Sequence, residues 1–318
     1  MRLPTARKHG GLTRKTALRL GAVGALAAAA IVPHVRHRLR IPAAVTVAST
    51  VAAPLAIAVL WPRSRKRDAA LFFGQMWAFA VSHELPYDNP EKLRSRLRID
   101  YPIKIDRWIG GGELPNARLQ RTLQRGRYGG TLTRLSAWTH WAWFAQPYLA
   151  LVWILLRHND RLPQSARQMA VTFDIGCAMY FLAPTAPPWW ASENGYTDDE
   201  VRRVMIEFGE QTWGLAWSRI FGTLSGNPWA AMPSLHFATS LMAAILLTEA
   251  GGRTEAVLGW GYAGALGFAL VYLGEHYVTD LLAGAAIVAI ARKGEPLAEP
   301  LVEFINSRLR RLEAIAAG

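Results

Sequence analysis

The chain alternates between long apolar blocks and short segments rich in arginine and lysine. A helix needs about 20 residues to cross the ~30 Å hydrocarbon core of a bilayer, so most of these blocks approach the length of a membrane span. The pattern therefore predicts an all-α integral membrane protein, with 69–83 as the weakest candidate span. We place the apolar blocks at residues 17–33, 42–61, 69–83, 136–156, 168–186, 235–249, 255–274 and 278–292.

The first apolar block, 17–33, has features of a targeting segment. It follows Arg14 and Lys15 and contains small residues at positions 27–30, a pattern that also suits a cleavable signal peptide. A second apolar block follows at once. We therefore favour a retained signal anchor, with cleavage as the alternative.

Composition changes the picture by adding a strong positive charge. Hydrophobic residues make up 51% of the chain, the mean hydropathy is +0.10, and 36 Lys and Arg against 23 Asp and Glu give a net charge of +13. These charges flank apolar stretches and form no recognisable nucleic-acid module, which favours anionic lipid over nucleic acid as the partner. The single cysteine, Cys177, excludes an intramolecular disulfide and a cysteine-rich metal site.

Basic residues in short loops predict the orientation in the membrane, because such loops stay on the cytoplasmic side. This rule places residues 187–233 and the segment around His276 outside. We therefore expect an integral protein of the inner, plasma membrane whose two outer segments share the extracytoplasmic face. The residues assigned to the cytoplasmic side are Arg157, Arg161, Arg167, Arg253, Arg292, Lys293, Arg308, Arg310 and Arg311.

Residues 84–134 oppose this orientation, because they are basic and fall on the outer side. Apolar and basic residues alternate in this segment, as in an amphipathic element in the headgroup layer, with Tyr101 and Trp108 as interfacial anchors. A solvated loop is the alternative, whereas Gly110–Gly112 and Pro115 disfavour a sheet. The expected organisation is N-terminal transmembrane helices and basic loops in 1–68, a main membrane domain in 69–292 with 84–134 as an interfacial insert, and a cytoplasmic tail in 293–318.

Two histidines at the rims of apolar blocks are the first candidates for chemistry, because an ionisable residue at membrane depth is costly. His236 follows Pro233 and Ser234, which together indicate the start of a helix. The serine hydroxyl and the free backbone N–H groups of such a start can receive a phosphate. His236 would face the same anion from the first turn.

His276 and Asp280 are four residues apart and share one helix face if the helix already includes the histidine. The carboxylate can then keep one imidazole nitrogen protonated and leave the other as a nucleophile or base. Two histidines, one of them oriented by Asp280, would make a nucleophile and a general acid.

These residues resemble a known family. Pro233-Ser234-Leu235-His236 looks like the second motif, and His276-x-x-x-Asp280 like the end of the third motif, of the type 2 phosphatidic acid phosphatase (PAP2) superfamily. Its members are integral-membrane phosphatases and phosphotransferases. The resemblance implies a six-helix core from residue 69 onward, preceded here by about two further helices.

By the same resemblance, His276 would be the nucleophile that forms a phosphohistidine, Asp280 its orienting partner and His236 the acid that protonates the leaving oxygen. The family works without a metal or other cofactor. This agrees with the lack of a cluster rich in His or Cys in the sequence.

The sequence departs from the family at the positions whose side chains bind the phosphate. The segment 183–190, expected to hold the first motif, lacks its Lys and Arg, and Leu270 stands where the third motif usually has an arginine. These losses resemble the inositol phosphorylceramide synthase branch. Arg202 and Arg203 are the nearest candidate phosphate grips, or solvated loop charges, and His140 either joins the substrate site or belongs to an aromatic belt.

The expected function is a lipid phosphotransferase that moves a phospho-headgroup, such as phosphoinositol, from a phospholipid to an alcohol acceptor such as inositol or a lipid. A metal-independent phosphatase acting on a lipid or polyprenyl phosphate or diphosphate is the second hypothesis. A non-catalytic lipid carrier or scaffold is the alternative of another class, since the missing cations weaken phosphate binding.

Overall fold

The computed structural model describes residues 13–124, 126–127, 129–214, 216–217 and 226–317. Within these ranges every regular element is a helix, and strand-like pairing is limited to two isolated bridges that join Thr185 to Arg98 and to Ala230. The all-α prediction is confirmed to this extent. The basic residues before residue 13 lie outside the described ranges, as do residues 218–225 of the predicted outer segment.

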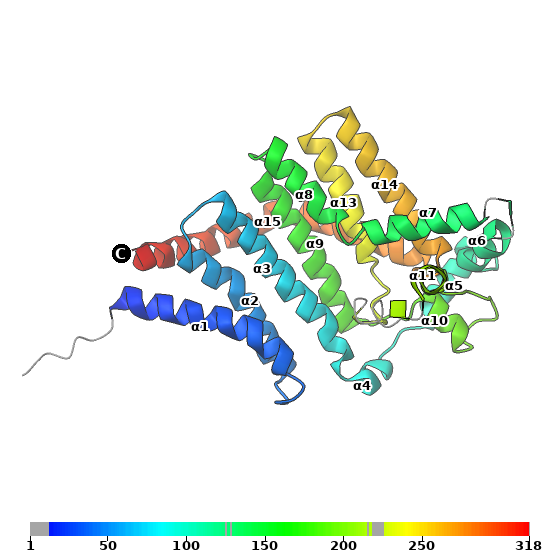
Figure 1. Cartoon of the computed structure of the whole chain (residues 1–318), viewed down its shortest axis with the longest axis horizontal. Coiled ribbons are helices and arrows are strands. Elements are labelled where there is room, and N and C mark those ends of the chain that lie inside the picture. The colour runs from blue at the N-terminus through cyan, green and yellow to red at the C-terminus, as the bar shows by residue number, and fades with distance from the viewer. Residues whose placement is uncertain (1–12, 125, 128, 215, 218–225, 318) are drawn as a thin grey trace, which may run out of the picture. The chain divides into compact units, whose positions relative to one another are not determined.

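The chain forms two compact units, residues 1–81 with 298–318 and residues 82–297. The first unit contains α1 (Arg14–Val35), α2 (Ala43–Leu60), most of α3 (Arg65–Glu84) and the end of α15 (Val278–Ala317). Helices α1 and α2 lie side by side (Figure 1). Glu313 of α15 pairs with Arg63 at 3.0 Å and with Arg67, so ion pairs join α15 to the start of α3 within this unit.

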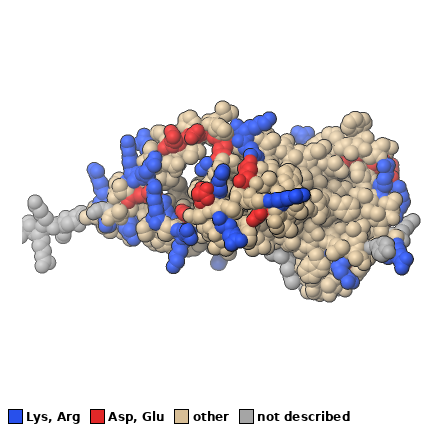
Figure 2. All heavy atoms as spheres, turned by 90° about the horizontal axis from the view of Figure 1, so that it is seen from above, with Lys and Arg blue, Asp and Glu red and all other residues tan. Residues whose placement is uncertain are grey.

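Three of the described helices are long and apolar enough to cross a membrane, namely α1, α2 and α14 (Arg253–Tyr272). Helix α13 (Leu235–Ala250) is apolar but shorter. Large apolar side chains such as Leu156 and Leu258 are 71% and 67% exposed, as expected for contact with lipid. One face of the molecule also has a wide area with few charged side chains (Figure 2). The predicted number of spans stays a prediction.

In the second unit, α13 and α14 form an antiparallel hairpin that packs against α7 (Gly129–Ala142), α8 (Gln146–Arg157) and α9 (Leu162–Leu182) (Figure 1). Close approach within the hairpin needs a residue without a side chain. A Cβ atom at Gly259 would lie 2.8 Å from Cα of Ala244. The hairpin therefore holds both helix ends that lead into the candidate site in a fixed relation.

The apolar block 136–156, which we expected as one span, is divided into α7 and α8. Helix α8 starts at Gln146, with Pro147 in its first turn. Proline lacks the N–H of the helix ladder and restricts the residue before it, so a helix that reaches Pro147 from α7 is interrupted. The division places His140 in the last turn of α7.

Within the segment 84–134, residues 84–124 form a folded layer of short helices: η1 (Leu85–Asp88), α4 (Pro90–Arg94), α5 (Asp100–Ile109) and α6 (Pro115–Gln124). Gly111 and Gly112 take φ values of +68° and +106° in the turn between α5 and α6. This layer has its own buried contacts with the following part of the chain, through Ile103, Leu114, Ala117, Val201 and Tyr277. The segment is therefore more than an amphipathic surface element, although Trp108 remains 82% exposed.

Two further short helices, α10 (Pro188–Glu193) and α11 (Val204–Trp213), lie at the same end of the second unit as α5 and α6 (Figure 1). The last helix, α15, is longer than the predicted block 278–292. It continues through the expected tail as far as Ala317.

Candidate functional site

The site is built where α9 and α14 end and where α13 and α15 begin. The backbone N–H of Ser234, just before α13, donates to the carbonyl oxygen of Asp280 in α15 at 3.0 Å. The hydroxyl of Tyr180 in α9 donates to the carbonyl oxygen of Pro233 at 2.8 Å. A Cβ at Gly284 would lie 2.8 Å from the carbonyl oxygen of Ser234. Both motifs are therefore fixed in backbone contact.

His276 and Asp280 interact, but not through a shared helix face. Helix α15 begins at Val278, so His276 lies in the turn before it. Its Nδ1 lies 3.2 Å from Oδ2 of Asp280, which also accepts the backbone N–H of Tyr277 at 2.9 Å. The same carboxylate thus caps the start of α15 and orients the imidazole of His276. With Nδ1 as the donor, the lone pair of His276 is on Nε2.

Nε2 of His276 faces the second histidine. It lies 3.3 Å from Nδ1 of His236, and the ring centroids are 5.4 Å apart at an angle of 61°. A nucleophile and an acid that act on the same phosphate need a separation that leaves room for it. In the structure the two nitrogens are within hydrogen-bond distance, so a phosphate must separate them or enter beside them.

The helix start predicted at Pro233 and Ser234 is confirmed. Ser234 is the N-cap of α13, and its hydroxyl oxygen accepts the backbone N–H of Phe237 at 3.3 Å. Ser234 is fully buried. This cap aims the first turn of α13, and with it His236, at the turn that carries His276.

His140 is brought to the histidine pair from α7. Its ring stacks on that of His236, with centroids 4.9 Å apart and an angle of 29°. Trp143, just after α7, lies 4.1 Å from the His236 ring. The two side chains border His236 and restrict how its imidazole can turn.

Arg203 lies beside the site. Its guanidinium Nε is 3.1 Å from Oε1 of Glu275, the residue next to His276, and its Cζ lies 4.2 Å from the centre of the Trp189 ring. Burial alone raises the pKa of Glu275, but the charges of Arg203, His140 and His276 outweigh burial, and the pKa falls below its usual value. Trp189 comes from the segment that lacks the expected first-motif cations. An arginine from another segment therefore packs on it.

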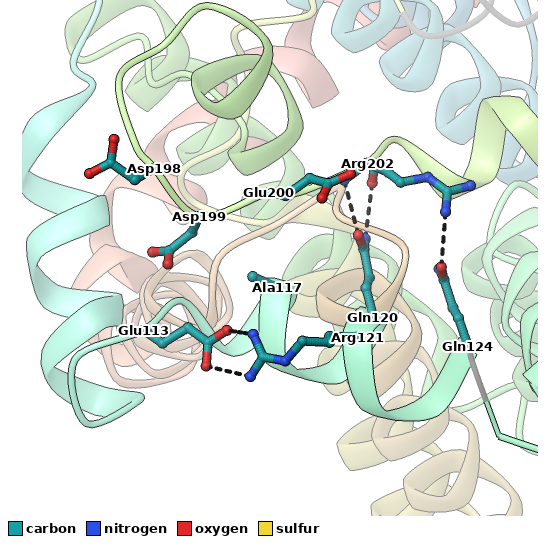
Figure 3. A pocket seen from close by; sticks show the side chains of 9 residues that line it. All are labelled: Glu113, Ala117, Gln120, Arg121, Gln124, Asp198, Asp199, Glu200 and Arg202. Atoms are coloured by element: carbon teal, nitrogen blue, oxygen red, sulfur yellow. Dashed lines mark hydrogen bonds and ion pairs between the residues drawn. The ribbon is translucent and has the colours of Figure 1, made fainter.

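Arg202 points elsewhere. Its guanidinium pairs with Glu207 and lies 3.3 Å from Oε1 of Gln124, at the edge of a pocket of about 560 Å³ (Figure 3). The same pocket contains the ion pair between Arg121 and Glu113. The two neighbouring arginines thus have different surroundings, and only Arg203 contacts the residue beside His276.

Two buried polar residues that the sequence analysis did not single out hold the same turn. Asn116 in α6 and Asp106 in α5 are both fully buried and hydrogen bond to residues 271–279. In the sequence, the one sign of this role is that each is a polar residue without positive charge in a segment that otherwise alternates apolar and basic positions. Leu270, at the position of the missing arginine, is fully buried in the apolar core. Among the described residues, no group of three His, Cys, Asp or Glu side chains is arranged to hold a metal ion.

Comparison with known proteins agrees with this geometry. Residues 105–293 match the PAP2 superfamily, a range that includes both histidines, Asp280 and the helices α6 to α14. No curated protein and no solved structure matches the chain. Membership of the superfamily indicates phosphatase or phosphotransferase activity on lipid-like substrates. Because the match covers more than half of the chain and includes the paired histidines, the protein belongs to the PAP2 superfamily.

Proposed function

We propose that the protein is a membrane lipid phosphotransferase that works through a phosphohistidine at His276. The observation that carries this proposal is the contact of 3.3 Å between Nε2 of His276 and Nδ1 of His236, with Asp280 on the other nitrogen of His276. A nucleophile oriented by a third group and facing a proton donor is the arrangement that covalent catalysis requires.

In the first step, Nε2 of His276 attacks the phosphorus of a lipid donor, and an N–P bond forms. The bond from phosphorus to the lipid oxygen breaks, and imidazolium His236 gives its proton to that oxygen. In the second step, the hydroxyl of an acceptor attacks the same phosphorus, the N–P bond breaks, and His236 takes the hydroxyl proton. Both histidines return to their starting state.

The charges around the pair support a phosphodiester as the donor. Arg203 supplies a positive charge next to His276, but Glu275 already partly neutralises it. Asp280 and the fully buried Asp106 add negative charge at the start of α15. Such a site stabilises a phosphate that carries one negative charge better than a doubly charged monoester or a diphosphate. A phospholipid with a phospho-alcohol headgroup, such as phosphoinositol, fits this balance.

Arg203 is the proposed phosphate-binding cation. Its pairing with Glu275 holds the guanidinium near His276, and Trp189 covers its face. His140, stacked on His236, and the start of α13 at Pro233 and Ser234 complete the proposed substrate site. When the phosphate binds, it replaces part of the interaction between the Arg203 guanidinium and the Glu275 carboxylate.

The proposed location is the inner, plasma membrane, with the site open to the extracytoplasmic side. The basic residues at the far ends of α9 and α14, such as Arg167 and Arg253, support this orientation. In a Cys177→Ala background, an impermeant thiol reagent applied to intact cells should label Asp198→Cys and spare Arg253→Cys. The reverse labelling would contradict the orientation.

Product analysis tests the reaction. The purified protein is incubated in mixed micelles with phosphatidylinositol labelled in its headgroup, with and without inositol or a diacylglycerol whose acyl chains differ from those of the donor, and the products are identified by mass spectrometry. Transfer of the labelled phospho-headgroup to an added acceptor is the expected result. Release of inositol phosphate alone would show that water is the acceptor and that the protein hydrolyses its donor, and an unchanged donor would favour a carrier.

A further inference from the structure

The turn that carries His276 is short and depends on neighbours to fix it. It joins the end of α14 at Tyr272 to the start of α15 at Val278. Gly274 has a φ of +81°, and a Cβ there would collide with the carbonyl oxygen of Arg202. Within the turn, the N–H groups of Glu275 and His276 donate to the carbonyl oxygen of Leu270, at 3.1 and 3.2 Å. The carbonyl groups of the turn require partners from elsewhere.

Asn116 in α6 supplies one such partner. Its side-chain Nδ2 donates to the carbonyl oxygen of His276 at 2.9 Å and to that of Val271 at 2.8 Å. One amide group thus ties the backbone of His276 to the last turn of α14. Because Asn116 is fully buried, water cannot replace these bonds without opening the layer.

Asp106 in α5 fixes the other side of the turn. Its two carboxylate oxygens accept the backbone N–H groups of Val278 and Thr279, at 2.8 and 2.9 Å, and the Thr279 hydroxyl. These are the free N–H groups at the start of α15, where a negative charge is also stabilised by the helix dipole. Asp106 therefore sets where α15 begins, in the same first turn that contains Asp280.

We infer that Asn116 and Asp106 are positioning residues that hold the His276 imidazole in line with the phosphorus, and that the layer of residues 84–124 serves this purpose. The two residues act through the backbone on both sides of His276, so a loss of either moves the nucleophile rather than the substrate. The inference rests on the proposed nucleophilic role of His276. Misplacement of a reacting group by about 1 Å costs about 100-fold in rate.

Gln120 provides a matched control for Asn116. It lies one turn further along α6, is 5% exposed, and its Nε2 also donates to two carbonyl oxygens, those of Tyr272 at 3.0 Å and Arg202 at 2.9 Å. Its Oε1 accepts the backbone N–H of Arg202 at 2.9 Å, and none of these hydrogen bonds involves His276 or α15. Replacing either residue by leucine therefore removes two buried donors from the same helix, but only one replacement releases the His276 carbonyl group.

The experiment compares full-length Asn116→Leu, Gln120→Leu and Asn116→Ser in detergent, with dodecyl p-nitrophenyl phosphate as the probe. Formation of the adduct on His276 by the unchanged protein is checked first, since its absence would refute the proposed function rather than this inference. We expect both leucine variants to lower the unfolding temperature similarly. Asn116→Leu should lose about tenfold more kcat than Gln120→Leu, with KM within about twofold.

Asn116→Ser keeps a single donor and should give an intermediate kcat, which keeps the test informative if Asn116→Leu does not fold. Equal losses of kcat in Asn116→Leu and Gln120→Leu would overturn the inference. So would a change confined to KM, or a serine variant whose kcat equals that of the unchanged protein.

Discussion

Nε2 of His276 and Nδ1 of His236 lie 3.3 Å apart, and the other nitrogen of His276 lies 3.2 Å from Asp280. The three groups form a chain in which Asp280 keeps a proton on Nδ1 and directs the lone pair of Nε2 at His236. When His236 is protonated, its Nδ1–H points at that lone pair. A phosphate that enters between the two rings takes the place of this contact, and it then has the nucleophile on one side and the acid beside the leaving oxygen.

Replacing His236 should affect poor and good leaving groups differently. The alcohol of a lipid donor needs a proton as it leaves, whereas p-nitrophenolate does not. His236→Ala should therefore lose about 100-fold or more of kcat with phosphatidylinositol, but much less of the initial release of p-nitrophenol from dodecyl p-nitrophenyl phosphate. Stopped-flow absorbance gives the second rate. Equal losses with both substrates would argue against an acid role for His236.

Gly284 tests the contact between the two motifs. Alanine there would place a Cβ 2.8 Å from the carbonyl oxygen of Ser234, so α15 and the start of α13 must move apart. The expected cost is about 1–3 kcal/mol in the free energy of unfolding, together with a loss of activity.

Gly294→Ala is the control for Gly284→Ala, because it lies in the same helix with no atom within 4 Å of its added Cβ. Alanine has the higher helix propensity, so this variant should gain up to about 1 kcal/mol. Both values come from denaturant unfolding in detergent. A Gly284→Ala protein as stable as Gly294→Ala would show that the two motifs are less tightly packed than described.

Much of the fold and the centre of the site could be predicted from the sequence, because those features depend on local patterns. The apolar blocks give most helices, and Pro233 with Ser234 gives the start of α13. Pro147 is a local signal for the separation of α7 from α8, but the apolar run 136–156 led us to predict a single span. Asp106 could not be predicted, because its partners Val278 and Thr279 are more than 170 residues away in the sequence.

The two adjacent arginines show the same limit. Arg202 and Arg203 lie in an irregular segment just before α11, where no helical or strand period tells which way a side chain points. Only the packing of Trp189 and Glu275 on Arg203 distinguishes them. The sequence showed that the first-motif cations are missing and named both arginines as candidates to replace them, but the choice of Arg203 required the structure.

Arg203 and Arg202 therefore form a matched pair of variants. If Arg203 binds the phosphate, Arg203→Gln should reduce kcat/KM by about 10- to 100-fold, the usual loss for a hydrogen bond between charged groups. Arg202→Gln should stay within about twofold, because Arg202 interacts with Glu207 and Gln124 instead. Initial rates over a range of donor concentrations measure both. Comparable losses in the two variants would remove Arg203 from its proposed role.

Glu275 predicts a dependence of stability on pH. Burial raises its pKa, but Arg203 and the neighbouring imidazoles outweigh burial, so its pKa in the folded protein lies below the ordinary value of 4.5. A carboxylate with a lowered pKa stabilises the fold above its unfolded pKa, and this contribution is lost as the pH falls through the folded pKa.

Glu275→Gln should therefore be less stable than the unchanged protein at pH 7, and the difference should shrink as the pH falls below the ordinary pKa of 4.5 and through the lower pKa of the folded protein. Thermal unfolding in detergent over this range measures it. A difference that stays constant with pH would mean that the Glu275 charge contributes nothing to the fold.

Mass spectrometry of the covalent adduct tests the central claim most directly. The protein is mixed with dodecyl p-nitrophenyl phosphate, quenched in alkali, where phosphohistidine is stable, and digested. The account predicts a dodecyl phosphate group on the peptide that contains His276, absent in His276→Ala and more abundant in His236→Ala, whose second step lacks a base. Continued turnover with an unmodified His276, or an adduct on another residue, would contradict it.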